Sequence, residues 1–219
     1  MTSIDIPSGV TSIGWGTFSG CSGLTSIDIP SGVTSIGDWA FSGCSGLTSI
    51  DIPSGVTSIA KGTFSGCSGL TSIDIPSGVT SIGDWAFDIC SKLTSVVIPS
   101  CVTSIGNQVF GNCYNLTSLY SYRPDPVAVD SNVFSGIDAN KCTLYVPQGS
   151  FGNYYVTSGW DYFSKIVEFD PTGIGAVTTK ADAKEVSRYS VDGQKLDTPV
   201  KGLNIVKYND GSIKKVVVE

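Results

Sequence analysis

The chain has 219 residues, of which 41% are hydrophobic and 15% are charged, a composition typical of a globular protein. Its net charge of −6 is unevenly distributed: residues 1–171 carry five Lys and Arg against 13 Asp and Glu, whereas residues 172–219 carry eight against six. A main domain with this excess of carboxylates repels phosphate backbones, which disfavours nucleic acid as a partner. No run of apolar residues approaches the roughly 18 that a membrane span needs.

An internal repeat of 23 residues occupies most of the chain. The Thr that opens the sequence TSIDIP recurs at a constant interval, at Thr2, Thr25, Thr48, Thr71, Thr94 and Thr117, and a degenerate seventh copy begins at Cys142. A period in the twenties with the form L-x-x-I-x-I is typical of leucine-rich-repeat solenoids, in which one coil cannot bury its apolar side alone. The sequence therefore predicts a mainly β solenoid, a right-handed stack of 23-residue coils.

Each copy is expected to form two extended pieces and one helical turn. Residues 24–29 alternate between apolar and polar side chains, the pattern of a strand with one buried face. Pro30 ends this strand, and residues 33–36 indicate a second, shorter extended piece. We expect Asp38 to cap a short helical segment that carries Phe41 inward.

Residues 23 apart occupy the same place in successive coils, so each repeat position forms a row across the stack. Two rows are large and apolar: Ile4, Ile27, Ile50, Ile73, Val96, Leu119 and Leu144 in one, and Phe18, Phe41, Phe64, Phe87 and Phe110 in the other. Each large side chain contributes about 1.5–3 kcal/mol when it is buried, so we expect these rows to form the core.

Five of the seven cysteines form a further row, at Cys21, Cys44, Cys67, Cys90 and Cys113. Successive coils lie about 4.8 Å apart, whereas a disulfide prefers Cβ atoms about 3.8 Å apart. We therefore interpret these residues as buried free thiols that pack as small apolar groups. Since no CxxC pair or Cys/His cluster is present, the sequence predicts no metal site and no cofactor.

Three regions are expected along the chain. Residues 1–168 form the solenoid, with six regular copies and a degenerate closing one, and residues 169–184 have the small, polar composition of a linker. Residues 185–219 read as a small C-terminal all-β module, because Asp-Gly pairs at 192–193 and 210–211 are each flanked by strand-like segments.

Catalytic chemistry has little support in the sequence. The chain contains no His, which removes the commonest general base and the Ser/His and Cys/His nucleophile pairs. There is no phosphate-binding G-x-x-x-x-G-K-[ST] sequence. Carboxylate pairs catalyse glycoside hydrolysis when their environments differ, and the carboxylates of the repeat occupy equivalent positions. We therefore predict that the protein is not an enzyme.

The most regular polar feature is a row on the exposed face of the first extended piece. It comprises Asp5, Asp28, Asp51 and Asp74 and continues through Val97 to Tyr120 and Tyr145. We name the four Asp and two Tyr residues the candidate binding strip. Two interpretations remain open: a solvated sheet face whose carboxylates discourage edge pairing, or a surface that binds a cationic ligand or Ca²⁺.

Three tryptophans are candidate aromatic contacts. Trp39 and Trp85 share a register two coils apart, and Trp15 is displaced by one residue. Exposed aromatic rings on this turn side can stack on sugars or anchor a protein partner. The alternative is that they pack between neighbouring coils.

The repeated unit I-P-S-G-V-T-S-I-G-x-x-A-F-S-G-C-S-G-L-T-S-I, together with LYVPQGS at residues 144–150, resembles the BspA-like class of leucine-rich repeats over residues 1–165. The tail, with YSVDGQKL at residues 189–196 and KGLNIV at residues 201–206, is similar to the C-terminal modules of secreted Bacteroidales-type proteins. The repeat family offers no fixed ligand residues for transfer to this chain.

This resemblance implies a secreted or surface-anchored, adhesin-like protein at the outer cell surface. Its partners would be host or bacterial surface proteins or glycans, and the alternative role is a structural spacer that presents other domains. Because Met1 stands where later copies have Leu and no polar cap precedes it, we expect that a leader was removed or trimmed. The uncapped first coil also suggests end-to-end self-association.

Overall fold

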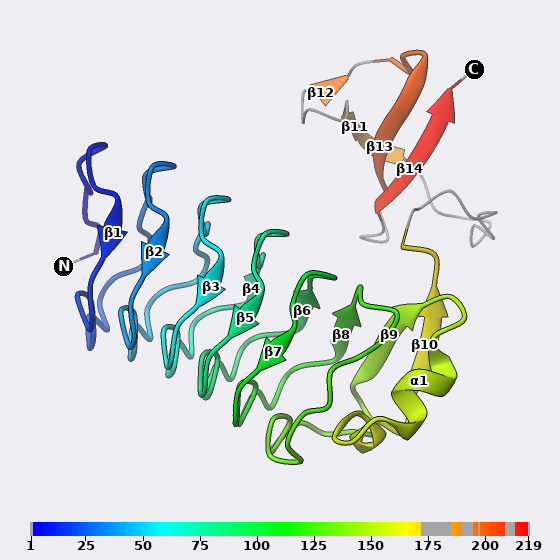
Figure 1. Ribbon diagram of the computed structural model, residues 1–219. Coiled ribbons are helices and arrows are strands. Elements are labelled where there is room, and N and C mark those ends of the chain that lie inside the picture. The colour runs from blue at the N-terminus through cyan, green and yellow to red at the C-terminus, as the bar shows by residue number, and fades with distance from the viewer. Residues whose placement is uncertain (1, 172–184, 190–194, 197, 209–212, 219) are drawn as a thin grey trace. The chain divides into compact units, whose positions relative to one another are not determined.

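The structure is a computed structural model that describes residues 2–171, 185–189, 195–196, 198–208 and 213–218. The chain divides into two compact units, Met1–Phe169 and Asp170–Glu219. The first unit is a parallel β-solenoid whose coils lie side by side in chain order, as predicted (Figure 1).

The second extended piece of each copy forms the more regular ladder. Its strands all consist of a Ser-Ile pair and are β1 (Ser12–Ile13), β2 (Ser35–Ile36), β3 (Ser58–Ile59), β5 (Ser81–Ile82) and β7 (Ser104–Ile105). They pair in parallel with Ser opposite Ser and Ile opposite Ile, in the sheets β1-β2 and β3-β5-β7. The 23-residue period therefore sets the register between coils directly.

The first extended piece forms a five-stranded parallel sheet only in the later copies. Its strands are β4 (Ser72–Ile73), β6 (Ser95–Ile98), β8 (Ser118–Ser121), β9 (Thr143–Pro147) and β10 (Ile166–Phe169), in the order β10-β9-β8-β6-β4. In earlier copies this piece makes isolated bridges, Asp5 to Asp28 and Asp51 to Asp74. Asp is unfavourable in strands, and the longer strands begin where Val97 and Tyr120 replace it.

The predicted apolar rows form the core. From Ile27 to Leu144 every member of the aliphatic row is buried, and the Phe rings from Phe41 to Phe110 are fully buried. Neighbouring Phe rings stack with centroids 5.2–5.6 Å apart, and Phe134 extends the stack at 6.3 Å from Phe110. Stacking between coils thus supplies the buried surface that a single coil lacks.

The predicted helical turn after Asp38 is wrong. Residues 38–43 form consecutive turns, in which Trp39 has φ +58°, outside the helical region. The Asp38 carboxylate accepts a hydrogen bond from the backbone N–H of Lys61 in the next coil, with an N···O distance of 3.1 Å. Asp84 accepts the equivalent bond from Asn107 at 2.7 Å. These carboxylates connect coils instead of capping a helix.

The cysteine row contains free thiols, as predicted. Cys44, Cys67, Cys90 and Cys113 are buried, and each thiol donates to the backbone carbonyl of a Phe in the preceding coil at 3.1–3.3 Å. Burial raises the pKa of the Cys44 thiol to about 11. These four thiols therefore pack as part of the core and are unreactive at neutral pH. Cys21 in the first coil is only partly buried, contrary to the prediction, because no preceding coil covers it.

An aromatic cluster closes the far end of the solenoid. Helix α1 (Phe151–Val156) and the 3-10 helix η1 (Trp160–Tyr162) supply the buried Tyr154 and Trp160, and the Trp160 ring packs against both Phe134 and Tyr154. The Tyr154 hydroxyl donates to the Arg123 carbonyl at 2.7 Å, and Trp160 Nε1 donates to the Val127 carbonyl at 2.8 Å. These bonds fix the loop that leads to Phe134.

The second unit is a small antiparallel sheet. Its strands are β11 (Glu185–Tyr189), β12 (Lys195–Leu196), β13 (Gly202–Tyr208) and β14 (Ile213–Val218), in the order β12-β11-β13-β14. The two strand pairs expected around the Asp-Gly turns are present, and pairing of β11 with β13 joins them. The turns at 192–193 and 210–211 and most of the predicted linker lie outside the described residues.

Candidate functional site

The candidate binding strip follows the first extended piece of successive coils. Its Asp residues make isolated bridges in the earlier coils, and Tyr120 and Tyr145 lie on β8 and β9 of the five-stranded sheet. Asp5, Asp28, Asp51 and Asp74 are exposed, and the strip changes character where Val97 takes the place of Asp. Val97 pairs with Tyr120, and Tyr120 pairs with Tyr145, across successive parallel strands. The structure therefore contains an acidic end and an aromatic end of one continuous row.

The four carboxylates of the strip differ from the other carboxylates of the solenoid in having no structural partner. Among the described residues, none of their side chains takes part in a hydrogen bond or ion pair. Elsewhere in the solenoid, hydrogen bonds are accepted by the carboxylates of Asp38, Asp84, Asp88, Asp125, Asp130, Asp138, Asp161 and Glu168. The charge of the strip is thus available to a ligand.

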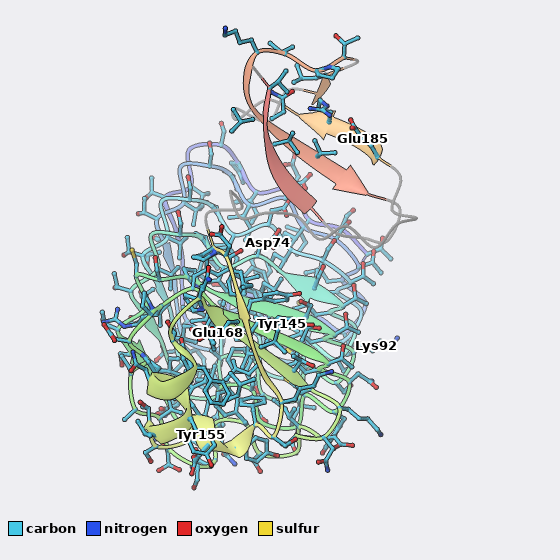
Figure 2. The ribbon with its side chains drawn as sticks, turned by 90° about the vertical axis from the view of Figure 1, so that its right-hand side faces the viewer. Asp74, Lys92, Tyr145, Tyr155, Glu168 and Glu185 are labelled. Carbon is cyan, nitrogen blue, oxygen red and sulfur yellow. The ribbon has the colours of Figure 1, made fainter. Side chains whose placement is uncertain are left out.

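No Lys or Arg side chain that the structure describes pairs with these four carboxylates. Like charges about 4.8 Å apart in water repel each other by about 1 kcal/mol. Lys92 points outward at the edge of the solenoid, away from Asp74 and Tyr145 (Figure 2). Lys141 pairs with Asp138 at 3.3 Å. A cationic ligand would relieve the repulsion along the strip.

The aromatic end is a fixed group of rings. Tyr120 and Tyr145 stack with centroids 4.4 Å apart and planes within 9°. Phe169 packs edge-on against Tyr120 at 5.9 Å and against Tyr122 at 5.0 Å. Burial raises the pKa of the Tyr120 hydroxyl, with smaller contributions from its Tyr neighbours. The rings hold one another in place without a ligand.

A shallow hollow lies beside these rings. It has a volume of about 220 Å³ and is lined by Ile75, Ser77, Val97, Pro99, Ser100 and Tyr122. The sequence prediction missed this hollow. The sequence signal for it is that Val97 replaces the Asp of the earlier copies and Tyr122 replaces their Pro. These two replacements do not by themselves predict an empty space.

The tryptophans occupy the turns and not the sheet that carries the strip. Trp15 is 77% exposed, whereas Trp39 and Trp85 are half-buried and stack with centroids 6.2 Å apart. The two rings come from coils two apart, and Gly62 of the intervening coil lies against Trp39. The Lys61 ammonium lies 4.8 Å from the Trp85 ring centroid. The pair therefore makes contacts between coils.

Within the described part of the chain, no group of three or more His, Cys, Asp or Glu side chains could hold a metal ion. The same residues contain no helix that is long and apolar enough to cross a bilayer.

Comparison with solved structures places the solenoid among bacterial repeat proteins. A leucine-rich cell surface protein from Faecalibacterium prausnitzii A2-165 is 30% identical, with a TM-score of 0.51, and the match covers 73% of this chain and 35% of that one. A leucine-rich repeat protein from Bacteroides ovatus is 28% identical, with a TM-score of 0.53, over 77% of this chain and 46% of that one. The chain thus spans less than half of either protein.

A third structure, the leucine-rich repeat protein of T. pallidum, matches in fold at 24% identity, with a TM-score of 0.53, over 76% of this chain and 70% of that one. A comparison with curated proteins found no match. The profile of the BspA type leucine-rich repeat region matches six copies over residues 1–118, which is more than half of the chain. The protein therefore belongs to the BspA-type leucine-rich repeat family.

Proposed function

We propose that this protein is a non-catalytic, adhesin-like binding protein of the bacterial cell surface, and that it recognises a host or bacterial surface protein or glycan through the candidate binding strip. The observation that carries the proposal is the unused charge of Asp5, Asp28, Asp51 and Asp74, since the described carboxylates elsewhere in the solenoid contribute to the fold. The similarity to a leucine-rich cell surface protein supports the location.

The repeat architecture supports recognition along a row. Parallel pairing holds the strip residues of successive coils about 4.8 Å apart, so charge and aromatic surface are presented at a fixed interval. Such a surface suits an elongated partner with repeated cationic groups. A deep pocket for a small substrate is not required.

The test uses the full chain on an array of host matrix proteins, bacterial surface proteins and glycans. A variant with Asn in place of Asp5, Asp28, Asp51 and Asp74 should bind the detected partner roughly tenfold more weakly or worse, because several exposed ion pairs are lost. The matched control replaces the exposed Ser12, Ser35, Ser58 and Ser104 with Lys. It raises the net charge as much as the Asn variant does, but on the sheets β1-β2 and β3-β5-β7 and not on the strip.

The outcome separates binding from a spacer role. A blank array would favour the spacer, in which the continuous ladders merely hold another domain away from the cell. Equal losses in the Asn and Lys variants would mean that net charge, and not the strip, attracts the partner. Roles for Trp15, Trp39 and Trp85 in binding, and end-to-end association of the first coil, stay predictions.

A further inference from the structure

We infer that the hollow beside Tyr122 receives one apolar side chain of an extended protein segment whose neighbouring Lys or Arg residues lie over the carboxylates of the strip. This inference rests on the proposed function and specifies the partner as protein. The lining is mainly apolar: Ile75, Val97, Pro99 and Tyr122 line it together with Ser77 and Ser100.

The size of the hollow favours a single side chain. At about 220 Å³ it is smaller than the roughly 300–1,000 Å³ of sites that enclose a small-molecule ligand. A sugar would also need several hydrogen-bonding groups around its hydroxyls, and two serines supply few. An aliphatic or aromatic side chain needs only apolar contact and the exclusion of water.

The hollow is held open by contacts on the side of the aromatic end. Phe169 packs edge-on against Tyr122 at 5.0 Å, and the Tyr122 backbone N–H donates to the Ile98 carbonyl at 3.0 Å. Arg123 donates to the Ser100 carbonyl at 3.2 Å and to the Asp125 carbonyl at 2.7 Å. A site already in its binding conformation loses little free energy to ordering when a partner binds.

Charge complementarity determines the rest of the partner. Along the row, Asp74 lies one coil from Val97 and Asp51 two coils away, at about 4.8 and 9.6 Å. In an extended segment that crosses the strands, alternate side chains are about 6.7 Å apart. A basic residue two positions from the apolar one therefore falls between these two carboxylates, and the next alternate basic residue falls near Asp28.

The test uses a fluorescent peptide, Thr-Lys-Thr-Lys-Thr-Phe-Thr-Lys-Thr-Lys-Thr, whose symmetry makes its direction irrelevant, and the full chain. Val97→Asp should weaken binding by roughly tenfold to a hundredfold, the effect of losing one buried apolar side chain. This variant should fold normally, because the four preceding coils carry Asp at this position. Val97→Thr, which keeps shape but not apolarity, should weaken binding less.

The controls identify each component. Val156→Asp makes the same chemical change at an exposed site on α1 and should leave binding unchanged. Replacing the peptide's Phe with Ser should cost as much as Val97→Asp, and replacing its Lys with Glu should abolish binding.

Several results would overturn the inference. One is equal binding by the Val97→Asp protein, and another is equal binding of the Ser peptide. Glycan binding that is lost in Val97→Asp, with no peptide binding, would assign the hollow to a carbohydrate. If the chain binds partners on the array but Val97→Asp has no effect, the proposed function survives without the hollow. A chain that binds neither peptide nor array contradicts both.

Discussion

Gly62→Ala should destabilise the solenoid far more than the same change at Gly16. The two glycines occupy the same repeat position with almost the same backbone, φ +60° and φ +58°. A Cβ on Gly62 would lie 2.6 Å from Trp39 Cδ2 and closer still to Cε3 and Cζ3, whereas a Cβ on Gly16 would meet nothing nearer than Ser19 Cβ at 3.8 Å. The comparison therefore separates backbone strain from the contact with the indole.

The magnitude follows from two contributions. A left-handed conformation costs Ala about 1 kcal/mol at either position. At Gly62 the Trp39 ring must also shift against Trp85, and forcing an atom into a packed site costs about 1–3 kcal/mol more. We expect unfolding free energies lower by about 1 kcal/mol for Gly16→Ala and by about 3 kcal/mol for Gly62→Ala, measured by urea denaturation followed by circular dichroism.

A double-mutant cycle with Trp39→Ala completes the experiment. Once the indole is absent, Gly62→Ala should cost only the backbone contribution of about 1 kcal/mol, so the coupling energy should be about 2 kcal/mol. Equal losses at Gly16 and Gly62, or a coupling energy near zero, would refute the packing of Trp39 on the intervening coil.

Two further predictions concern the turns and the thiols. Ile89 has φ +59° and is 46% exposed, and the earlier copies have Gly20, Gly43 and Gly66 at this repeat position. Because glycine adopts this backbone conformation without strain, Ile89→Gly should raise the free energy of unfolding by about 1 kcal/mol in urea denaturation. Ile89→Ala, which keeps a Cβ, should not raise it. A loss of stability with Gly would contradict this. At pH 8, a thiol reagent should label the exposed Cys101 and the partly buried Cys21 in the native state, and should reach the buried thiols of Cys44, Cys67, Cys90 and Cys113 only on unfolding. Burial raises the pKa of the Cys44 thiol from its ordinary 9.0 to about 11, so the folded protein keeps this thiol protonated at a pH where the unfolded chain ionises it. The stability that the protonated thiol provides is therefore complete below pH 9 and is lost between pH 9 and 11. Thermal melts across that pH range would detect the loss.

The ladders were predictable because every coil has the same length. When the period is constant, sequence spacing determines spatial neighbours, so the partners of Phe41 follow from counting, and the stack with Phe18 and Phe64 agrees. The thiol row follows from the same rule. Only where the period breaks, at Phe134, does counting fail, and there the closing aromatic cluster restores the stack.

The turn conformation was not predicted because local preference and tertiary context disagree. Asp before an Ala-Phe pair favours a helix start, but Trp39 and Trp85 adopt positive φ. The informative signal was in other copies, since Gly16 and Gly62 occupy the same position with the same φ. A bulky residue there is tolerated because the adjacent coil presents a glycine that the indole can cover.

The strip and the hollow show why binding chemistry can change in a repeat protein without loss of the fold. At β6 the outward-facing residue changes from the exposed Asp of earlier coils to the half-buried Val97, while its neighbours Val96 and Ile98 stay buried in the core rows. The coil register is kept through this change, because Val97 pairs with Tyr120 just as Asp51 pairs with Asp74, although the strand becomes longer. Each exposed position can therefore vary independently of the core. The residues that distinguish one coil from the next on this face, Val97, Tyr120 and Tyr122, are accordingly where a specific partner is expected to make its closest contacts.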